Sequence, residues 1–243
     1  MLKLIQPISK KDQVVSAIKE AILSGDIEPG EQIVESRMAH QLGSGIPLVR
    51  EALIALEHQG FVQKTPYKGT TVTKLGPTEL QQVFQLRVEL EPLAVEWAKK
   101  NVTAADIREL QGLIKGMERA AQKVDLVQFY QHDLDWHRKL WALSGNAYLA
   151  DVLERLVVPL FAFFLVKNKR ERRAYVESAG MHSMIVAALQ NASAAEARRL
   201  MKESLKGWKE DMMVMHFKDT SKGNNDRTGY QRTFVRTCPV SLV

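Results

Sequence analysis

Apolar residues recur at helical spacing through most of the chain, and the pattern changes once, after Gly60. Before that glycine it predicts three helices: one that follows Ser9 and stops at Gly25, one at about residues 35–41, and one that follows a turn at residues 42–45 and ends before Gly60. Four apolar residues of the third helix share one face, at positions i, i+3, i+4 and i+7: Val49, Ala52, Leu53 and Leu56. Arg50 lies on the opposite side. One face can therefore pack on a small core while the other is free to enter a groove.

After Gly60 the pattern is that of two short strands. Residues 61–65 and 70–74 are rich in β-branched side chains, and residues 66–69 form the turn between them. Three helices followed by a two-stranded hairpin predict a winged helix-turn-helix over residues 1–75. Three lysines of the hairpin suit contact with phosphate groups: Lys64, Lys68 and Lys74. The alternative is that they form a charged edge that prevents pairing with another sheet.

From residue 76 to about residue 218 the periodicity is helical throughout. It predicts a second domain of six helices joined by short loops, beginning near residues 77, 104, 126, 147, 174 and 194. The fourth helix is predicted to bend or break near Pro159. Residues 219–243 lack a helical period and are rich in glycine, asparagine, threonine and arginine, so we predict a disordered tail. The fold class is mainly α: an N-terminal winged helix-turn-helix followed by an all-α helical bundle.

Composition and charge narrow the class of protein. With 243 residues, 45% of them hydrophobic, the chain is long enough for two folded domains. The net charge of +6 divides as +1 for residues 1–75, +3 for 76–218 and +2 for 219–243, so charge alone does not indicate nucleic-acid binding. Cys238 is the single cysteine, which excludes an internal disulfide framework and fits a reducing cytosol. The apolar runs are short or interrupted, so we expect neither a signal peptide nor a membrane span, and a cytoplasmic protein.

The first domain resembles the DNA-binding domain of GntR-family bacterial regulators. The resemblance covers residues 27–72, IEPGEQIVESRMAHQLG…PLVREALIALEHQGFVQKTPYKGTTV, and depends on the PGE turn, the VREAL core, the GFV helix exit and the PxxGT wing. It implies a homodimer whose two recognition helices read a palindromic operator in double-stranded DNA. The positions that match DNA-contacting positions of the family are Ser36, Arg37, Gly45, Ile46, Arg50, Lys68 and Gly69.

Two of these positions depart from the family's usual residues. An arginine is expected at the position of Ile46, where it would make bidentate contact with guanine. Isoleucine offers only apolar contact, for example to a thymine methyl group. An arginine is also frequent at the position of Ser36, and here Arg37 follows it. The base preference is therefore expected to differ from the family's commonest half-site.

One group of residues in the helical domain has metal-ligand chemistry. Asp133 and His137 are four residues apart on the third predicted helix of the bundle, so they share a face. Apolar neighbours on that helix indicate that this face looks inward, and a buried carboxylate and imidazole need a partner. A zinc or similar ion is one such partner, with His182 of the fifth helix as a candidate third ligand. The alternative is that Asp133 and His137 pair with each other or with nearby arginines.

The helical domain is similar to the FCD effector domain of the FadR-like subgroup of the same family. The similar segments are RVELEPLAVEWA at residues 87–98, DLDWHRKLWALSGNAYL at residues 133–149, and the helix that contains His182. The resemblance implies a divalent metal such as zinc, nickel or manganese, held by one aspartate and three histidines, which in turn binds a carboxylate effector. Asp133, His137 and His182 match three of those ligands.

The fourth ligand position falls on Ser204, and serine is a poor ligand for these ions. Two alternatives follow for the predicted site. Three protein ligands and water can hold a metal, or the pocket can bind its effector by hydrogen bonds alone. Arg87 matches an arginine that meets the acid group of the effector, and its guanidinium suits bidentate carboxylate binding. Its alternative role is an ion pair with Glu91, one helical turn away.

These observations predict a dimeric transcription regulator rather than an enzyme. By resemblance it is a repressor, located in the bacterial cytoplasm and on the nucleoid through DNA binding. A small organic acid bound in the helical domain is expected to change the spacing of the two recognition helices and hence the operator affinity. Two alternatives stay open: a metal-dependent enzyme that uses Asp133, His137 and His182, and a DNA-binding protein without effector control.

Overall fold

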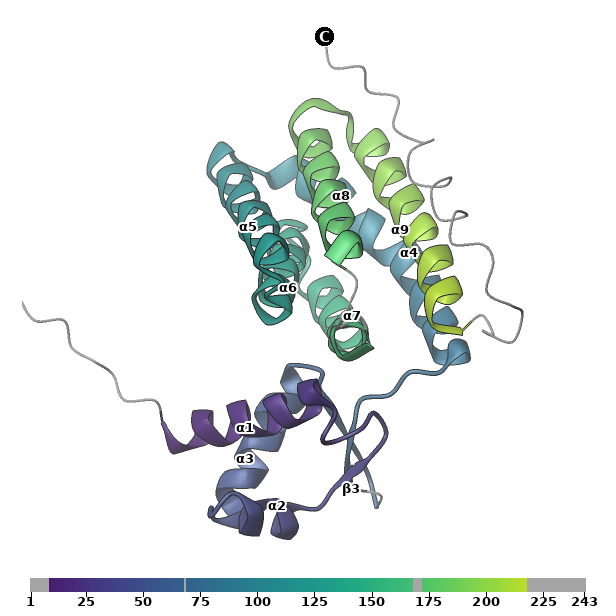
Figure 1. Cartoon of the computed structure of the whole chain (residues 1–243). Helices are drawn as coiled ribbons and strands as arrows, with labels where there is room; N and C mark the ends of the chain where they lie inside the picture. The colour runs from purple at the N-terminus through teal and green to yellow at the C-terminus, as the bar shows by residue number, and fades with distance from the viewer. Residues whose placement is uncertain (1–8, 68, 168–171, 218–243) are drawn as a thin grey trace, which may run out of the picture.

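The computed structural model describes residues 9–67, 69–167 and 172–217. Figure 1 shows a small N-terminal domain beside one end of a bundle of long helices, with α7 (Ala147–Lys167) at the base of the bundle. Lys68 and the predicted tail at residues 219–243 lie outside the described residues. None of the described helices combines the length and the hydropathy needed to span a bilayer.

The N-terminal domain contains α1 (Lys10–Ser24), α2 (Glu35–Gln41) and α3 (Ile46–His58). The oxygen of the Ser9 side chain caps α1 by accepting a hydrogen bond from the backbone N–H of Asp12 at 3.1 Å. A proline in its first turn suits the start of α3, because that N–H needs no helical partner. The four apolar residues predicted to share a face of α3 are all buried. The helical period therefore predicted the orientation of this helix correctly.

The sheet of this domain has one strand more than the sequence predicted. Strands β1 (Gln32–Ile33), β2 (Val62–Thr65) and β3 (Gly69–Val72) pair in the antiparallel order β1-β3-β2. Strand β1 was missed because two residues are too short to show a period. The second wing strand ends earlier than predicted, at Val72 instead of residue 74: Val72 pairs with Val62, and the chain leaves the sheet after it.

The bundle contains α4 (Pro77–Asn101), α5 (Ala104–Lys123), α6 (Leu126–Leu143), α7, α8 (Arg172–Asn191) and α9 (Ala194–Phe217). Several helix starts have the side-chain caps that local sequence predicts, including a complete capping box between Thr103 and Asp106. The predicted break near Pro159 is wrong, because α7 continues through it. Proline also lies inside α4, at Pro92.

One hydrophobic cluster continues from the N-terminal domain into the bundle. It includes Ile18 and Phe61 on one side and Tyr130, Val158 and Phe161 on the other. The rings of Phe61 and Tyr130 meet edge to face, with 5.8 Å between centroids. Burial of a side chain such as Phe61 contributes about 1.5–3 kcal/mol, so this interface is a substantial part of the fold.

The C-terminal end of α3 lies directly against α7 at this interface. Gly60 has a φ of 76°, and a Cβ built there would lie 2.6 Å from the carbonyl oxygen of Val158. Glycine is required here for two reasons: the backbone is left-handed, and a side chain would collide with Val158. Lys19 strengthens the same region, since its Nζ donates a hydrogen bond to Gln59 Oε1 at 3.2 Å and lies 4.7 Å from the centroid of the Phe61 ring.

Candidate functional site

The exposed side of α3 presents Arg50, whose side chain is 57% accessible. Its guanidinium is held by Glu35 of α2: Nη2 donates to Oε2 at 2.8 Å, and Nε donates to the same carboxylate at 3.1 Å. This pairing lowers the pKa of the Glu35 carboxyl and raises that of Arg50. The contact orients the arginine on the helix that is predicted to read DNA.

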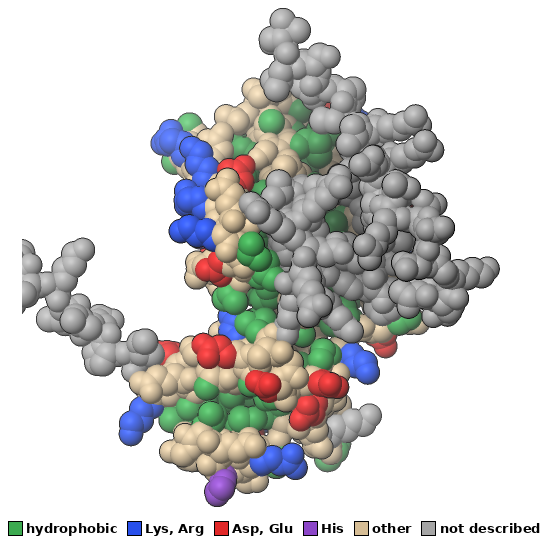
Figure 2. Space-filling view, viewed as in Figure 1, with side chains coloured by type: hydrophobic (Ala, Val, Ile, Leu, Met, Phe, Trp, Pro, Cys, Tyr) green, Lys and Arg blue, Asp and Glu red, His purple; other side chains and the backbone are tan. Residues whose placement is uncertain are grey.

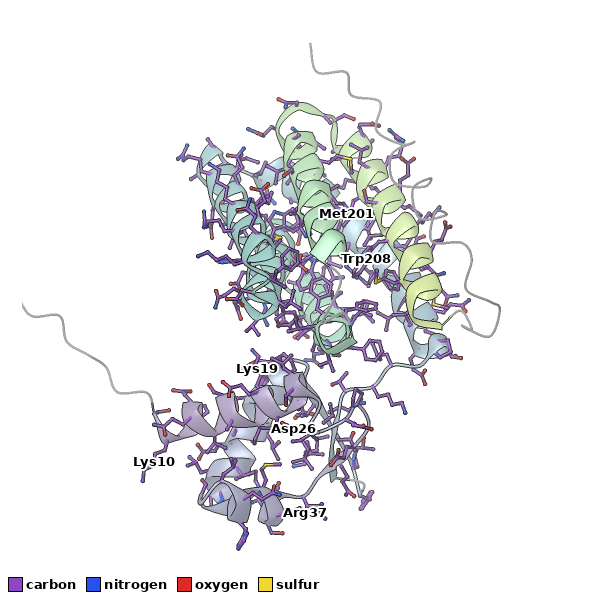
Figure 3. All side chains as sticks on the ribbon, viewed as in Figure 1. Lys10, Lys19, Asp26, Arg37, Met201 and Trp208 are labelled. Atoms are coloured by element: carbon purple, nitrogen blue, oxygen red, sulfur yellow. The ribbon has the colours of Figure 1, made fainter. Side chains whose placement is uncertain are left out.

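The other residues predicted to contact DNA gather on the same domain. Ser36, Arg37, Gly45, Ile46 and Gly69 are all exposed. Gly69 has a φ of 81° at the tip of the wing. Figure 3 places Arg37 on the side of the domain away from the bundle, whereas Lys19 faces the bundle. On the face shown in Figure 2, the end of the domain farthest from the bundle carries basic and histidine side chains. This surface suits a polyanion.

The bundle brings Asp133, His137 and His182 together. Each offers one ligand atom, and these atoms lie within 4.8 Å of one another. His182 Nε2 lies 2.9 Å from Asp133 Oδ1 and 3.3 Å from His137 Nε2. Both imidazoles are 2% exposed. Within the described residues this is the one group whose donor set and spacing suit a metal ion.

Helix packing produces this group from two distant segments. Asp133 and His137 face inward because α6 buries Leu134, Leu140 and Trp141 on neighbouring turns. His182 arrives on α8, whose apolar side is buried against α5. The ring of Trp136 flanks both imidazoles, with centroids 4.3 Å from His182 and 5.1 Å from His137. Trp136 is itself buried, so this tryptophan belongs to the core and also contacts the group.

The electrostatics of the group favour a cation. Burial lowers the pKa of His137 below the usual value for histidine, so the imidazole is neutral at pH 7. Its Nδ1 lies 3.0 Å from Oε2 of the buried carboxylate Glu91. Asp133 Oδ1 is buried and faces two imidazole nitrogens, His182 Nε2 at 2.9 Å and His137 Nε2 at 3.9 Å. A buried carboxylate oxygen that faces two imidazole nitrogens fits a divalent ion. Ser204, the residue at the expected fourth position, is half-buried on α9.

Arg87 of α4 lies next to this group through Glu91. Its Nε donates to Glu91 Oε1 at 2.5 Å, and the arginine is 1% exposed. Three aromatic rings surround the guanidinium carbon, with centroids at 5.2–5.3 Å: Phe84, Phe161 and Trp208. Figure 3 shows where Trp208 lies on α9. Nη1 is buried and has no hydrogen-bond partner among the described residues, so the ion pair with Glu91 does not use the whole guanidinium.

Sequence reasoning missed the second contact of Glu91. The spacing of Arg87 and Glu91 predicted their ion pair, but no local pattern connects Glu91 with His137 on another helix. Burial raises the pKa of the Glu91 carboxyl, whereas the charge of Arg87 and the hydrogen bonds from both neighbours outweigh burial and leave the pKa well below its usual value. The carboxylate is therefore ionised at neutral pH and balances Arg87.

A helix-turn-helix with a wing, joined to a helical bundle that buries a group of polar side chains, is the architecture of a two-domain DNA-binding regulator. Residues 10–72 match the family model described as bacterial regulatory proteins, gntR family, and residues 82–207 match the FCD domain. The chain belongs to the GntR family and carries an FCD domain. Members of this family are transcription regulators that bind DNA operators, and the chain is not an enzyme.

Known relatives agree with this assignment. The chain is similar to the HTH-type transcriptional regulator McbR of Escherichia coli K12, with 29% identity over 182 residues, covering 73% of this chain and 81% of the relative. The HTH-type transcriptional repressor NanR of Klebsiella aerogenes is 29% identical over 164 residues, which cover 58% of this chain and 62% of NanR.

Solved structures show the same fold. The structure of E. coli McbR/YncC matches with a TM-score of 0.64 and 25% identity, covering 86% of this chain and 98% of that one. A putative GntR regulator from Rhodococcus sp. RHA1 also has a TM-score of 0.64, at 17% identity over 84% of this chain and 97% of its own. The mainly α prediction with an N-terminal winged domain is confirmed.

Proposed function

We propose that this chain is a sequence-specific repressor whose operator affinity is controlled by a small organic acid bound in the helical domain. In this proposal residues 1–75 bind DNA and residues 76–218 bind the effector and form the dimer. The observation that carries it is the buried group of Asp133, His137 and His182, connected to Arg87 by Glu91.

The DNA-binding part of the proposal is a homodimer that reads a palindrome. Arg50 enters the major groove from α3, and Gly45 and Ile46 lie at the start of that helix. Ser36 and Arg37 of α2 contact the adjacent backbone, and the wing around Gly69 contacts the flanking phosphates, with Lys68 as its predicted phosphate contact. Glu35 keeps Arg50 in place until a guanine or phosphate competes for it.

The effector part of the proposal uses the two halves of the pocket. Asp133, His137 and His182 would hold a divalent metal, which supplies a Lewis-acid centre for a carboxylate oxygen. Arg87 contributes the unpaired Nη1 to a second acid oxygen or to another acceptor of the effector. The side chains around the proposed site are the aromatic rings near Arg87 and Trp136 beside the imidazoles, so we expect a compact acid with a short apolar part.

Helix α7 contacts both the proposed effector site and the end of α3, and it can therefore couple effector binding to DNA binding. Phe161 of α7 contacts both pocket halves, at 5.0 Å from the His137 ring and 5.2 Å from the Arg87 guanidinium carbon. One turn earlier, Val158 lies against Gly60 at the end of α3. A ligand that shifts α7 thereby moves the recognition helix. A preference of a few kcal/mol for one arrangement is enough to change operator occupancy.

The first test measures metal content and DNA affinity in the same preparations. Protein purified without an affinity tag for metals is analysed by elemental mass spectrometry, beside His137→Ala and the surface control His58→Gln. We expect about one zinc, nickel or manganese per chain in wild type and the control, and a loss in His137→Ala.

Operator affinity is then measured on a duplex selected from random DNA, with and without citrate, lactate and similar acids. We expect an acid to alter the affinity of wild type at least tenfold and to leave His137→Ala unaffected. Operator binding that responds to no acid in a metal-loaded protein would favour a DNA-binding protein without effector control.

A further inference from the structure

Glu91 connects the two halves of the proposed effector site, and we infer that it is a positioning residue for His137. The inference rests on the proposed function in one respect, that His137 is a metal ligand. The Glu91 carboxylate is 0% exposed, and each of its oxygens faces one charged or polar neighbour. Oε1 accepts from Arg87 Nε at 2.5 Å, and Oε2 lies 3.0 Å from His137 Nδ1.

The contact with Glu91 selects one tautomer of His137. A neutral imidazole carries hydrogen on one nitrogen only, and an ionised carboxylate can only accept. Glu91 therefore keeps the hydrogen on Nδ1 and leaves a lone pair on Nε2. Nε2 is the nitrogen that faces Asp133 Oδ1, at 3.9 Å, and His182 Nε2, at 3.3 Å. Carboxylates that orient metal-binding histidines in this way contribute substantially to metal affinity. Their contribution matters more where serine replaces a fourth ligand.

The alternative role of the Glu91 carboxylate is only to balance the charge of Arg87. Replacement of Glu91 by glutamine distinguishes this role from the positioning of His137. Glutamine offers one carbonyl oxygen and one NH₂ group. Arg87 is a donor only, so it takes the carbonyl oxygen. The NH₂ group then faces His137 Nδ1 and favours the tautomer with hydrogen on Nε2, which blocks the nitrogen that faces Asp133. Glu91→Gln thus switches the tautomer even though the side chain keeps its shape.

The experiment uses the full chain and Zn²⁺ alone. Affinity is measured by competition with a chromophoric chelator, and the tautomer of His137 is read from ¹⁵N chemical shifts of metal-free, histidine-labelled protein. Glu91→Gln leaves Arg87 buried without its counter-ion and can fail to fold. Two double variants avoid that problem, since both remove the buried charge pair: Arg87→Met with Glu91→Gln, and Arg87→Met with Glu91→Met. They differ in whether position 91 carries an amide that can form a hydrogen bond with His137 Nδ1.

We expect hydrogen on Nδ1 of His137 in wild type and on Nε2 in Glu91→Gln, which should bind Zn²⁺ about 10- to 100-fold more weakly. The double variant with glutamine should keep the wild-type tautomer, because its carbonyl can turn to His137, and should bind Zn²⁺ more tightly than the double variant with methionine. Equal Zn²⁺ affinities and equal tautomers in the two double variants would overturn the inference and leave the proposed function intact. If wild type binds no Zn²⁺, the metal part of the proposed function fails, and the tautomer comparison alone decides the role of Glu91.

Discussion

The phenol of Tyr130 donates a hydrogen bond to the backbone carbonyl of Gln59 over 3.0 Å. Tyr130 lies on α6, one turn before the proposed ligand Asp133, and Gln59 is the residue that ends the recognition helix α3. Burial raises the pKa of Tyr130, so the phenol keeps its proton at any physiological pH. The helix that carries two of the proposed ligands is thus hydrogen-bonded to the end of the helix that is proposed to read DNA.

Removal of this hydrogen bond should lower the free energy of unfolding. It should also weaken the coupling between the proposed effector site and α3. Tyr130→Phe keeps the buried ring but leaves the Gln59 carbonyl without its donor, at a cost of about 0.5–1.5 kcal/mol in the free energy of unfolding. Urea denaturation measures this change. Tyr148→Phe is the matched control, because Tyr148 is 87% exposed and should change stability by less than about 0.5 kcal/mol. Equal stabilities of Tyr130→Phe and wild type would argue against the bond.

A side chain at Gly60 should disturb the domain interface. Gly60→Ala places a Cβ 2.6 Å from the Val158 carbonyl oxygen in a left-handed conformation, which alone costs about 1–2 kcal/mol. We expect a lower midpoint of thermal unfolding. Gly112→Ala is the control, since no heavy atom outside its own helix lies within 4 Å of its added Cβ. Alanine inside α5 should raise stability by about 0.5–1 kcal/mol. A loss at Gly60 larger than the roughly 2 kcal/mol that the left-handed backbone alone explains would support the close approach, and a smaller loss would argue against it.

Arg50 should contribute to sequence-specific rather than general DNA binding. Arg50→Ala is expected to cost about 1–3 kcal/mol on a selected operator if the arginine reads a base. Fluorescence anisotropy on the operator and on a scrambled duplex separates the two kinds of binding. A similar loss on both duplexes would instead indicate that Arg50 contacts phosphate. An unchanged operator affinity would contradict the proposed docking of α3.

Metal removal should destabilise the helical domain if the proposed site is correct. A ligand that binds only the folded state stabilises it by about 2.7 kcal/mol at 100 times its dissociation constant. Dialysis against a chelator should therefore lower the unfolding temperature of wild type, and added Zn²⁺ should restore it. His182→Ala should show neither effect. A shift of the same size in His182→Ala would place the metal elsewhere.

Acid should remove the contribution of Asp106 to stability. Hydrogen bonds from Lys139 and from Thr103 lower the pKa of Asp106 below 3.8, its ordinary value. The folded state thus binds fewer protons than the unfolded state between the two pKa values, and stability rises with pH there. The contribution is complete above about pH 5 and is lost as pH falls through the folded pKa. The stability difference between wild type and Asp106→Asn should shrink in acid. A constant difference would show that the carboxylate charge is not involved.

Local sequence determined the helices and the side each one buries. The apolar face of α3 follows from the positions of Val49, Ala52, Leu53 and Leu56, because an α-helix returns to the same face every three to four residues. The pairing of Asp133 with His137 on one side of α6 follows from the same period. Serine, threonine and aspartate caps located the helix starts, since a cap acts within three residues of itself.

Only the tertiary structure decided which of these local features meet. His182 lies 45 residues after His137, and Glu91 comes 46 residues before it, yet the packing of α4, α6 and α8 places all three in contact. The pairing of β1 with β3 and the contact of Gly60 with Val158 are equally remote in sequence. A periodic pattern reports the direction of a side chain relative to its own helix. The partner it meets depends on how the helices pack, and that depends on the whole core at once.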